Sequence, residues 1–235
     1  MTIPVGSGTT GTYTFAAGAG DLVLLAFSRI GLRRSDLSTQ HLVDAGMEAN
    51  LLMVDVTNRS PNRWTLETQS QALTSPTAVY TLSNRTIGIG LAYISTTSGG
   101  VTTDRVLGPI SATEYASIPN KGTLAPPTSY FFSLLTTPTI TLWPAPDTGG
   151  PYTLNMLTFR QNQDVDLTNG QSVDCPYRFL DAFATGLAAR LAEIYAPAKA
   201  DRLYAQYEQR FTLAASLDAE STPIFITPGL AGYFK

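Results

Sequence analysis

The side chains that most often carry out catalysis are scarce in this chain, which has one histidine, His41, and one cysteine, Cys175. Either residue type can act as a base or a nucleophile, but each needs a partner that orients it or exchanges a proton with it. His41 falls at the edge of the apolar face of a predicted helix, and Cys175 directly precedes a proline that can start a helix. We therefore interpret His41 as a structural or partly solvated residue and Cys175 as a packing residue.

Asp164 and Asp166, with Asp174 further on, form the carboxylate cluster of the sequence. Paired carboxylates can hydrolyse glycosides or bind calcium. The run Asp-Val-Asp-Leu-Thr-Asn-Gly lacks the later glutamate of a calcium loop. A solvated loop before a helix is the simpler interpretation, and a hydrolase that uses Asp164 and Asp166 stays open as an alternative.

The sequence lacks the residue patterns of common metal and phosphate sites. No second histidine exists, and Cys175 has no neighbour at ligand spacing. Gly88 and Gly90 alternate with apolar residues as in a strand, which indicates a bulge or a tight packing site and not a phosphate loop. No Gly-x-Ser-x-Gly motif is present. We predict no cofactor, no metal and no enzymatic activity.

Arg33 and Arg34, with Arg29 nearby, form the tight basic cluster of the chain. They could contact DNA phosphate or an acidic partner, or they could form a solvated helix corner without a function. The net charge of -3 and the pI of about 5.1 argue against a protein that reads DNA sequence, because such a protein needs a basic face. They do not argue against a protein through which DNA passes.

Composition indicates a surface made for contact with other proteins. The chain has 235 residues, of which 43% are hydrophobic and only 14% charged, well below the usual quarter or so. Uncharged hydroxyl and amide groups fill the polar positions, and these are easier to desolvate than ions. A single cysteine allows no intrachain disulfide, and the first residues do not resemble a signal peptide, so we expect synthesis in a cytoplasm.

The N-terminal part reads as two helices. Asp21 can cap the first helix, and Gly31 stands where a left-handed residue ends it. Ser35 or Ser38 starts the second helix. Its apolar positions step by three or four residues: Leu42, Ala45, Ala49, Leu52 and Val56.

The middle of the chain alternates apolar and polar residues in short runs between turn residues, which predicts an antiparallel sandwich or barrel. Ser98-Gly99-Gly100 and Asp147-Thr148-Gly149-Gly150 are predicted hairpin turns.

The C-terminal part returns to the helical period. Pro176 starts a helix with apolar residues at every fourth position, surrounded by small residues that let another helix approach. Pro197 breaks the pattern, and a second helix follows with Leu203, Tyr207 and Phe211 on one face.

The predicted fold class is therefore α+β, a four-helix bundle formed by the N- and C-terminal helices with an inserted antiparallel β-sandwich or barrel. The predicted divisions are a flexible N-terminal arm (1–20), a helical domain (21–60 and 176–220), an inserted β domain (61–175) and a C-terminal tail (221–235).

Three motifs of the C-terminal half resemble a known family. They are Trp143-Pro144-Ala145-Pro146, the proline-started run from Cys175 to Ala182, and Gly186-Leu187-Ala188-Ala189-Arg190-Leu191-Ala192. Together with the N-terminal helix pair they resemble the head-to-tail adaptor proteins of tailed bacteriophages, the connector or tail tubular proteins, and most closely those of short-tailed phages. The resemblance covers mainly residues 20–60 and 140–218.

The resemblance implies a virion protein at the head-to-tail interface, made in the host cytoplasm. It implies a homo-oligomeric ring, usually of twelve subunits, that joins the portal protein to a tail or nozzle protein. DNA would pass through this ring during genome ejection without sequence recognition, and no membrane would be involved. C-terminal segments of the family often reach the portal, which assigns portal binding to the end of this chain: Pro223, Phe225, Pro228, Tyr233, Phe234 and Lys235.

A carbohydrate-binding or tail-fibre-like β module is the alternative function. Trp64, Tyr80, Tyr93 and Tyr130 could form a platform on which sugars stack. We favour the interpretation that these side chains fill the β core.

Overall fold

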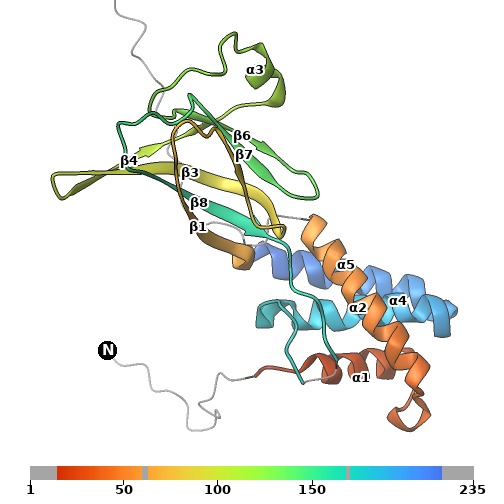
Figure 1. Cartoon of the computed structure of the whole chain (residues 1–235). Coiled ribbons are helices and arrows are strands. Elements are labelled where there is room, and N and C mark those ends of the chain that lie inside the picture. The colour runs from red at the N-terminus through yellow and green to blue at the C-terminus, as the bar shows by residue number, and fades with distance from the viewer. Residues whose placement is uncertain (1–14, 60–62, 168–169, 219–235) are drawn as a thin grey trace, which may run out of the picture.

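The computed structural model describes residues 15–59, 63–167 and 170–218. The described part is an α+β protein in which most helices lie at one end and two four-stranded sheets lie at the other (Figure 1). The α+β class predicted from the sequence is thereby confirmed.

Helix α4 (Leu180–Tyr195) lies at the centre of the helical end and contacts three other helices. These are α1 (Ala19–Ile30), α2 (Thr39–Arg59) and α5 (Ala200–Ser216). Short 3-10 helices occupy the connections: η1 (Arg34–Asp36), η2 (Arg63–Thr65), η3 (Tyr177–Phe179) and η4 (Pro197–Lys199). In Figure 1, α2 crosses in front of α4, and α1 lies furthest from the sheets.

Helix α1 begins at Ala19, two residues before the expected cap at Asp21, which lies in its first turn. The backbone N–H of Ala19 donates to the carbonyl of Gln171, so a segment distant in sequence takes the place of a side-chain cap. Gly31 ends the helix with a φ of 100°, as predicted, because glycine adopts this left-handed conformation without a steric penalty.

The first sheet is antiparallel and has the strand order β1-β8-β3-β4. Its strands are β1 (Leu66–Ala72), β8 (Tyr152–Arg160), β3 (Thr86–Ser98) and β4 (Val101–Val106). The second sheet has the order β2-β7-β6-β5. Its strands are β2 (Val79–Thr81), β7 (Thr139–Trp143), β6 (Ser129–Ser133) and β5 (Gly108–Pro109).

Two features of the sheets differ from the prediction. Strand β5 runs parallel to β6, so the second sheet is mixed and not antiparallel. A parallel pair needs a long connection, and residues 110–128, which include α3 (Ala112–Ser117), supply it. The run Asp147-Thr148-Gly149-Gly150 is not a hairpin turn, because β7 and β8 on either side of it belong to different sheets.

The other glycine predictions agree with the structure. Gly99 and Gly100 have φ values of 58° and 78° in the tight turn that joins β3 to β4. The β3–β8 register shifts around Gly88 and Gly90, as expected for bulges. A Cβ on Gly90 would lie 3.2 Å from a ring carbon of Phe159, which explains the need for a bare backbone there.

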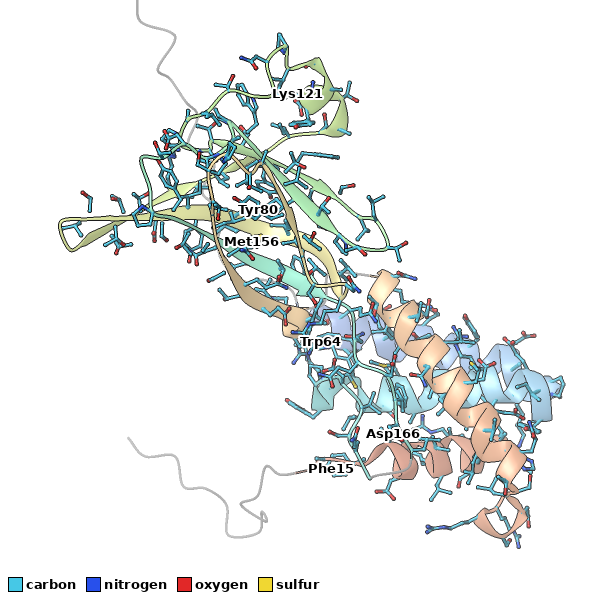
Figure 2. All side chains as sticks on the ribbon, in the orientation of Figure 1. Phe15, Trp64, Tyr80, Lys121, Met156 and Asp166 are labelled. Atoms are coloured by element: carbon cyan, nitrogen blue, oxygen red, sulfur yellow. The ribbon has the colours of Figure 1, made fainter. Side chains whose placement is uncertain are left out.

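Two hydrophobic clusters form the core. One lies between the sheets and contains Tyr80, Tyr130, Leu154 and Met156, among others. The other joins the helices, and the segment after β8 contributes Val165 and Val173 to it. Trp64 lies where the two ends of the molecule meet, as Figure 2 shows, and its ring packs 4.6 Å from that of Phe179.

Candidate interaction surfaces

His41 and Cys175, whose side chains could take part in catalysis, both pack against other residues of the helical end. The ring of His41 lies 4.6 Å from that of Tyr195 and 5.8 Å from that of Phe27. Its Nδ1 accepts a hydrogen bond from the backbone N–H of Ser38 at 3.1 Å, at the start of α2. Cys175 packs partly buried against the helical cluster, and burial raises the pKa of its thiol to about 12. A thiol with this pKa stays protonated at neutral pH and is a poor nucleophile.

Of the three predicted carboxylates, Asp174 is held in a network of hydrogen bonds. Asp174 accepts two hydrogen bonds from Arg160, at 2.5 and 3.1 Å, and a third from the backbone N–H of Gln163. The segment around Asp164 is packed against α2, because Asn50 exchanges two hydrogen bonds with the backbone of Val165. Asp164 itself is exposed, in agreement with the predicted solvated loop, whereas its neighbours Asn162 and Val165 are buried. Among the described residues, no group of three or more acidic, histidine or cysteine side chains could hold a metal ion.

The four aromatic residues considered for sugar stacking do not share an exposed face. Tyr80 and Tyr130 are buried between the sheets, and Trp64 packs with the helices. Tyr93 follows the buried Ala92 on β3, and successive side chains of a strand point to opposite faces. The prediction that these side chains fill the β core is therefore confirmed for Tyr80 and Tyr130, but it is wrong for Trp64 and Tyr93.

Several ion pairs at the helical end join one helix to another. Within the described part of the chain, seven arginines form ion pairs with carboxylates. Arg59 of α2 donates to both Asp55 and Glu208, and its guanidinium lies 4.9 Å from the centre of the Tyr207 ring. The hydrogen bond from Arg59 lowers the pKa of Glu208. Part of the small number of charged side chains is therefore engaged in contacts within the fold.

A second ionic cluster joins α1 and α5 across the N-terminal end of α4. Arg29 of α1 and Arg210 of α5 both contact the carboxylate of Asp181, at 2.6 and 3.0 Å, and both donate to the hydroxyl of Thr185. Asp181 remains 58% exposed. Two cations thus share one carboxylate on this side of the molecule, which leaves a positive surplus within the cluster.

The solvent face of α2 is apolar. Its exposed side chains at helical spacing are Val43, Met47, Leu51 and Val54, with exposed fractions of 61, 64, 45 and 56%. We call these four residues the α2 stripe. A surface helix normally places charged residues on this face, and a helix that is apolar all round is normally buried. The α2 stripe is therefore a candidate for contact with another protein.

The two flanks of the α2 stripe differ. On one flank lie Asp44, Glu48 and Asp55. Asp44 accepts from the hydroxyl of Tyr195, Glu48 from Arg190 at 3.4 Å, and Asp55 from Arg59 and Tyr207.

On the other flank lies a cavity of about 170 Å³ between α2 and the segment after β8. Its lining includes Val54 of the α2 stripe and Asn162, which is only 5% exposed. Neither side-chain amide atom of Asn162 has a hydrogen-bond partner among the described residues. Such unpaired buried amides are uncommon in folded proteins.

Of the remaining predicted site residues, the structure describes Arg33 and Arg34. Arg33 and Arg34 are exposed in the turn between α1 and α2, at the end of the helical part away from the sheets (Figure 1). The predicted portal-binding residues lie outside the described residues: Pro223, Phe225, Pro228, Tyr233, Phe234 and Lys235.

The predicted apolar row of this helix does not include the α2 stripe. Of that row, Ala45, Ala49, Leu52 and Val56 are buried, whereas Leu42 is 44% exposed. A second row, with spacings of four, four and three residues, was present on the opposite face of the same helix. No helix in the described ranges is long and apolar enough to span a membrane, so neither row indicates a transmembrane segment.

Ion pairs between helices and an exposed apolar helix face are together typical of a protein that assembles with other proteins. Comparison with known families supports this class: the model of the SU10 adaptor protein family matches residues 17–226. The chain therefore belongs to this family of phage head-to-tail adaptors, which are structural proteins of the virion. The match confirms the adaptor part of the resemblance seen in the sequence. No curated protein matches the chain.

Proposed function

We propose that the chain is one subunit of an adaptor ring that joins the portal to the tail of a phage virion and forms part of the DNA channel. The α2 stripe is the observation that carries this proposal. Four apolar side chains that are 45–64% exposed in the single chain are accounted for if a protein covers them in the assembled virion. Membership of the adaptor family supports the same conclusion.

We propose twelve subunits and a phage of the short-tailed group, on the basis of the motifs around Trp143 and Gly186. We propose that a four-helix bundle from both ends of the chain carries an inserted β-sandwich, with domain boundaries as predicted. Absence of enzymatic activity also remains a prediction.

We propose two contacts of the ring, one made by the uncharged C-terminal segment and one made by the exposed arginines between α1 and α2. The uncharged segment from Pro223 to Phe234 would order on the portal. Arg33 and Arg34 would face DNA phosphate or an acidic partner. A wall with few unpaired charges would let DNA pass without binding it strongly.

Size-exclusion chromatography with light scattering, on the chain mixed with its portal protein, tests the proposal. We expect a complex whose mass corresponds to a ring of subunits on each portal, and cryo-microscopy of virions should show that ring between portal and tail. A shortened chain that ends at Ser221 should bind the portal more weakly. A full chain that neither binds the portal nor occurs in virions would contradict the proposed function.

A further inference from the structure

We propose that the α2 stripe packs against the opposite side of a second copy of this chain, where Arg29 of α1 and Arg210 of α5 both contact Asp181. This inference rests on the proposed ring and names the contact that builds it. The receiving side, called here the α1/α5 face, is defined by Arg29, Arg210 and Asp181 with the exposed leucines Leu25 and Leu213. Leu25 is 43% exposed, and Leu213 is 70% exposed.

The first support is the placement of the two surfaces on opposite sides of α4. Helix α2 meets α4 at Gly186 and Arg190: a Cβ on Gly186 would touch Leu52, and Arg190 contacts Glu48. At 3.6 residues per turn, these positions lie on the opposite side of α4 from Asp181 and Thr185.

When two identical subunits bind through opposite sides, each of them still has one of the two surfaces uncovered. The contact repeats from subunit to subunit and closes into a ring when the rotation between neighbours allows it.

The second support is apolar complementarity. Leu25 precedes Arg29 by one helical turn, and Leu213 follows Arg210 by nearly one turn, so each leucine lies on the same helix surface as its arginine. The α1/α5 face therefore offers apolar side chains beside its cations. The α2 stripe offers four apolar side chains and no charged ones.

The third support is charge. The flank of the α2 stripe has three carboxylates, Asp44, Glu48 and Asp55, and only Arg59 and Arg190 as ion-pair partners in the described chain. The carboxylate of Asp44 bonds to the uncharged groups of Gln40 and Tyr195. Arg59 is in addition shared with Glu208.

This side of the chain is therefore negative, whereas the cluster of Arg29, Arg210 and Asp181 has two arginines on one carboxylate. Exposed Asp21 lies one turn before Leu25, so the positive surplus is local to this cluster. Opposite charges at the α2 flank and at the cluster favour contact between the two surfaces over contact of either surface with itself.

Two variants and their mixture test the contact. Met47→Glu places a carboxylate in the α2 stripe, and the double variant Leu25→Glu/Leu213→Glu does so on the α1/α5 face. All three positions are exposed, so each variant is expected to fold, which circular dichroism checks. Val101→Glu is the matched control, because Val101 is 66% exposed at the β3–β4 turn, far from the helices (Figure 1).

Sedimentation and mass photometry of the full chain, alone and with the portal, give the readout. We expect wild type and Val101→Glu to form the same oligomers, and either interface variant to lose self-association by about tenfold or more, because an unpaired charge would be buried. An equimolar mixture of the two interface variants should form one-to-one dimers, since one intact α2 stripe meets one intact α1/α5 face.

Three outcomes overturn the inference. The first is Met47→Glu, or the double variant, assembling like wild type. The second is a mixture that stays monomeric although wild type assembles. The third is a wild-type chain that remains monomeric both alone and on the portal. If the chain self-associates in this complementary way but ignores the portal, the proposed function fails and the contact stands. If the chain binds the portal and Met47→Glu still forms the ring, the function stands and the contact fails.

Discussion

Tyr207 of α5 packs against the bare Cα of Gly186 in α4. A Cβ at Gly186 would lie 2.9 Å from two ring carbons of Tyr207 and 3.0 Å from Cδ1 of Leu52 in α2. The Tyr207 ring is 2% exposed, and its hydroxyl donates to Asp55 at 3.2 Å, so it has little freedom to move away. This one glycine therefore lets α2, α4 and α5 approach one another closely.

Gly186→Ala should consequently destabilise the protein. Overpacking a closed core costs about 1–3 kcal/mol, which exceeds the roughly 1 kcal/mol that alanine gains over glycine in a helix. Urea unfolding measures the difference. Gly20→Ala in α1 is the control, because nothing lies within 4 Å of the added Cβ, and it should raise stability. Equal stabilisation by both substitutions would contradict the close contact with Tyr207.

The ion pair of Arg59 with Glu208 makes stability depend on pH. The hydrogen bond from Arg59 is the largest cause that lowers the pKa of Glu208 in the folded chain. A lowered folded-state pKa contributes stability above the ordinary glutamate pKa of about 4.3, and this contribution is lost as the pH falls through the lowered value. Because the Glu208 side chain is 47% exposed, solvent screening limits the effect to about 1 kcal/mol or less.

Glu208→Gln should therefore lose less stability than wild type when the pH is lowered from 7 to 3. Chemical unfolding at both pH values gives this difference. A variant whose pH dependence matches that of wild type would show that the ion pair contributes nothing measurable.

The ion pair of Arg160 with Asp174 should matter more, because its side chains are only 15 and 19% exposed. Burial acts to raise the pKa of Asp174, but the hydrogen bonds from Arg160 and from the backbone of Gln163 outweigh it, so the pKa is lowered. Asp174→Asn should cost about 1–3 kcal/mol in thermal unfolding, since a partly buried guanidinium loses its partner.

Arg85→Gln provides the comparison for Asp174→Asn. Arg85 is 58% exposed in a looser pair, 3.4 Å from Glu67, and its replacement should change stability by about 0.5 kcal/mol or less. Similar losses in both variants would contradict the distinction between the two pairs.

Cys175 should react slowly in the folded chain. Burial raises the pKa of its thiol to about 12, so at pH 8 the reactive thiolate is scarce. We expect alkylation by iodoacetamide at pH 8 to be roughly a hundredfold slower, or more, than in denaturant, where the pKa returns to about 8.5. Mass spectrometry follows the reaction. Comparable rates in both states would show that the thiol is open to solvent and ionises normally.

Asn162→Leu should stabilise the isolated chain. The two amide atoms of Asn162 have no partner among the described residues, and an unsatisfied buried polar group costs about 1–3 kcal/mol. The neighbouring cavity offers room for the apolar side chain. A rise in the midpoint of thermal unfolding checks this prediction. A fall would mean that the amide is hydrogen-bonded after all.

The sequence by itself determined the local features, because each depends on residues close together in the chain. The stop of α1 at Gly31 and the tight turn at Gly99 and Gly100 follow from the ability of glycine to adopt positive φ. The helical hairpin after Pro176 follows from apolar residues at every fourth position. Small residues around them predicted a close helix contact, which Gly186 makes with Tyr207.

Tertiary structure alone decided which elements meet. The run from Asp147 to Gly150 has the composition of a hairpin turn, yet it joins two different sheets, because strand pairing depends on partners far along the chain. Asn50 holds the backbone of Val165 although 115 residues separate them. The exposure of the α2 stripe was also decided by tertiary structure: both faces of α2 carry apolar rows in the sequence, and packing against α4 determined which row was buried and which faces solvent.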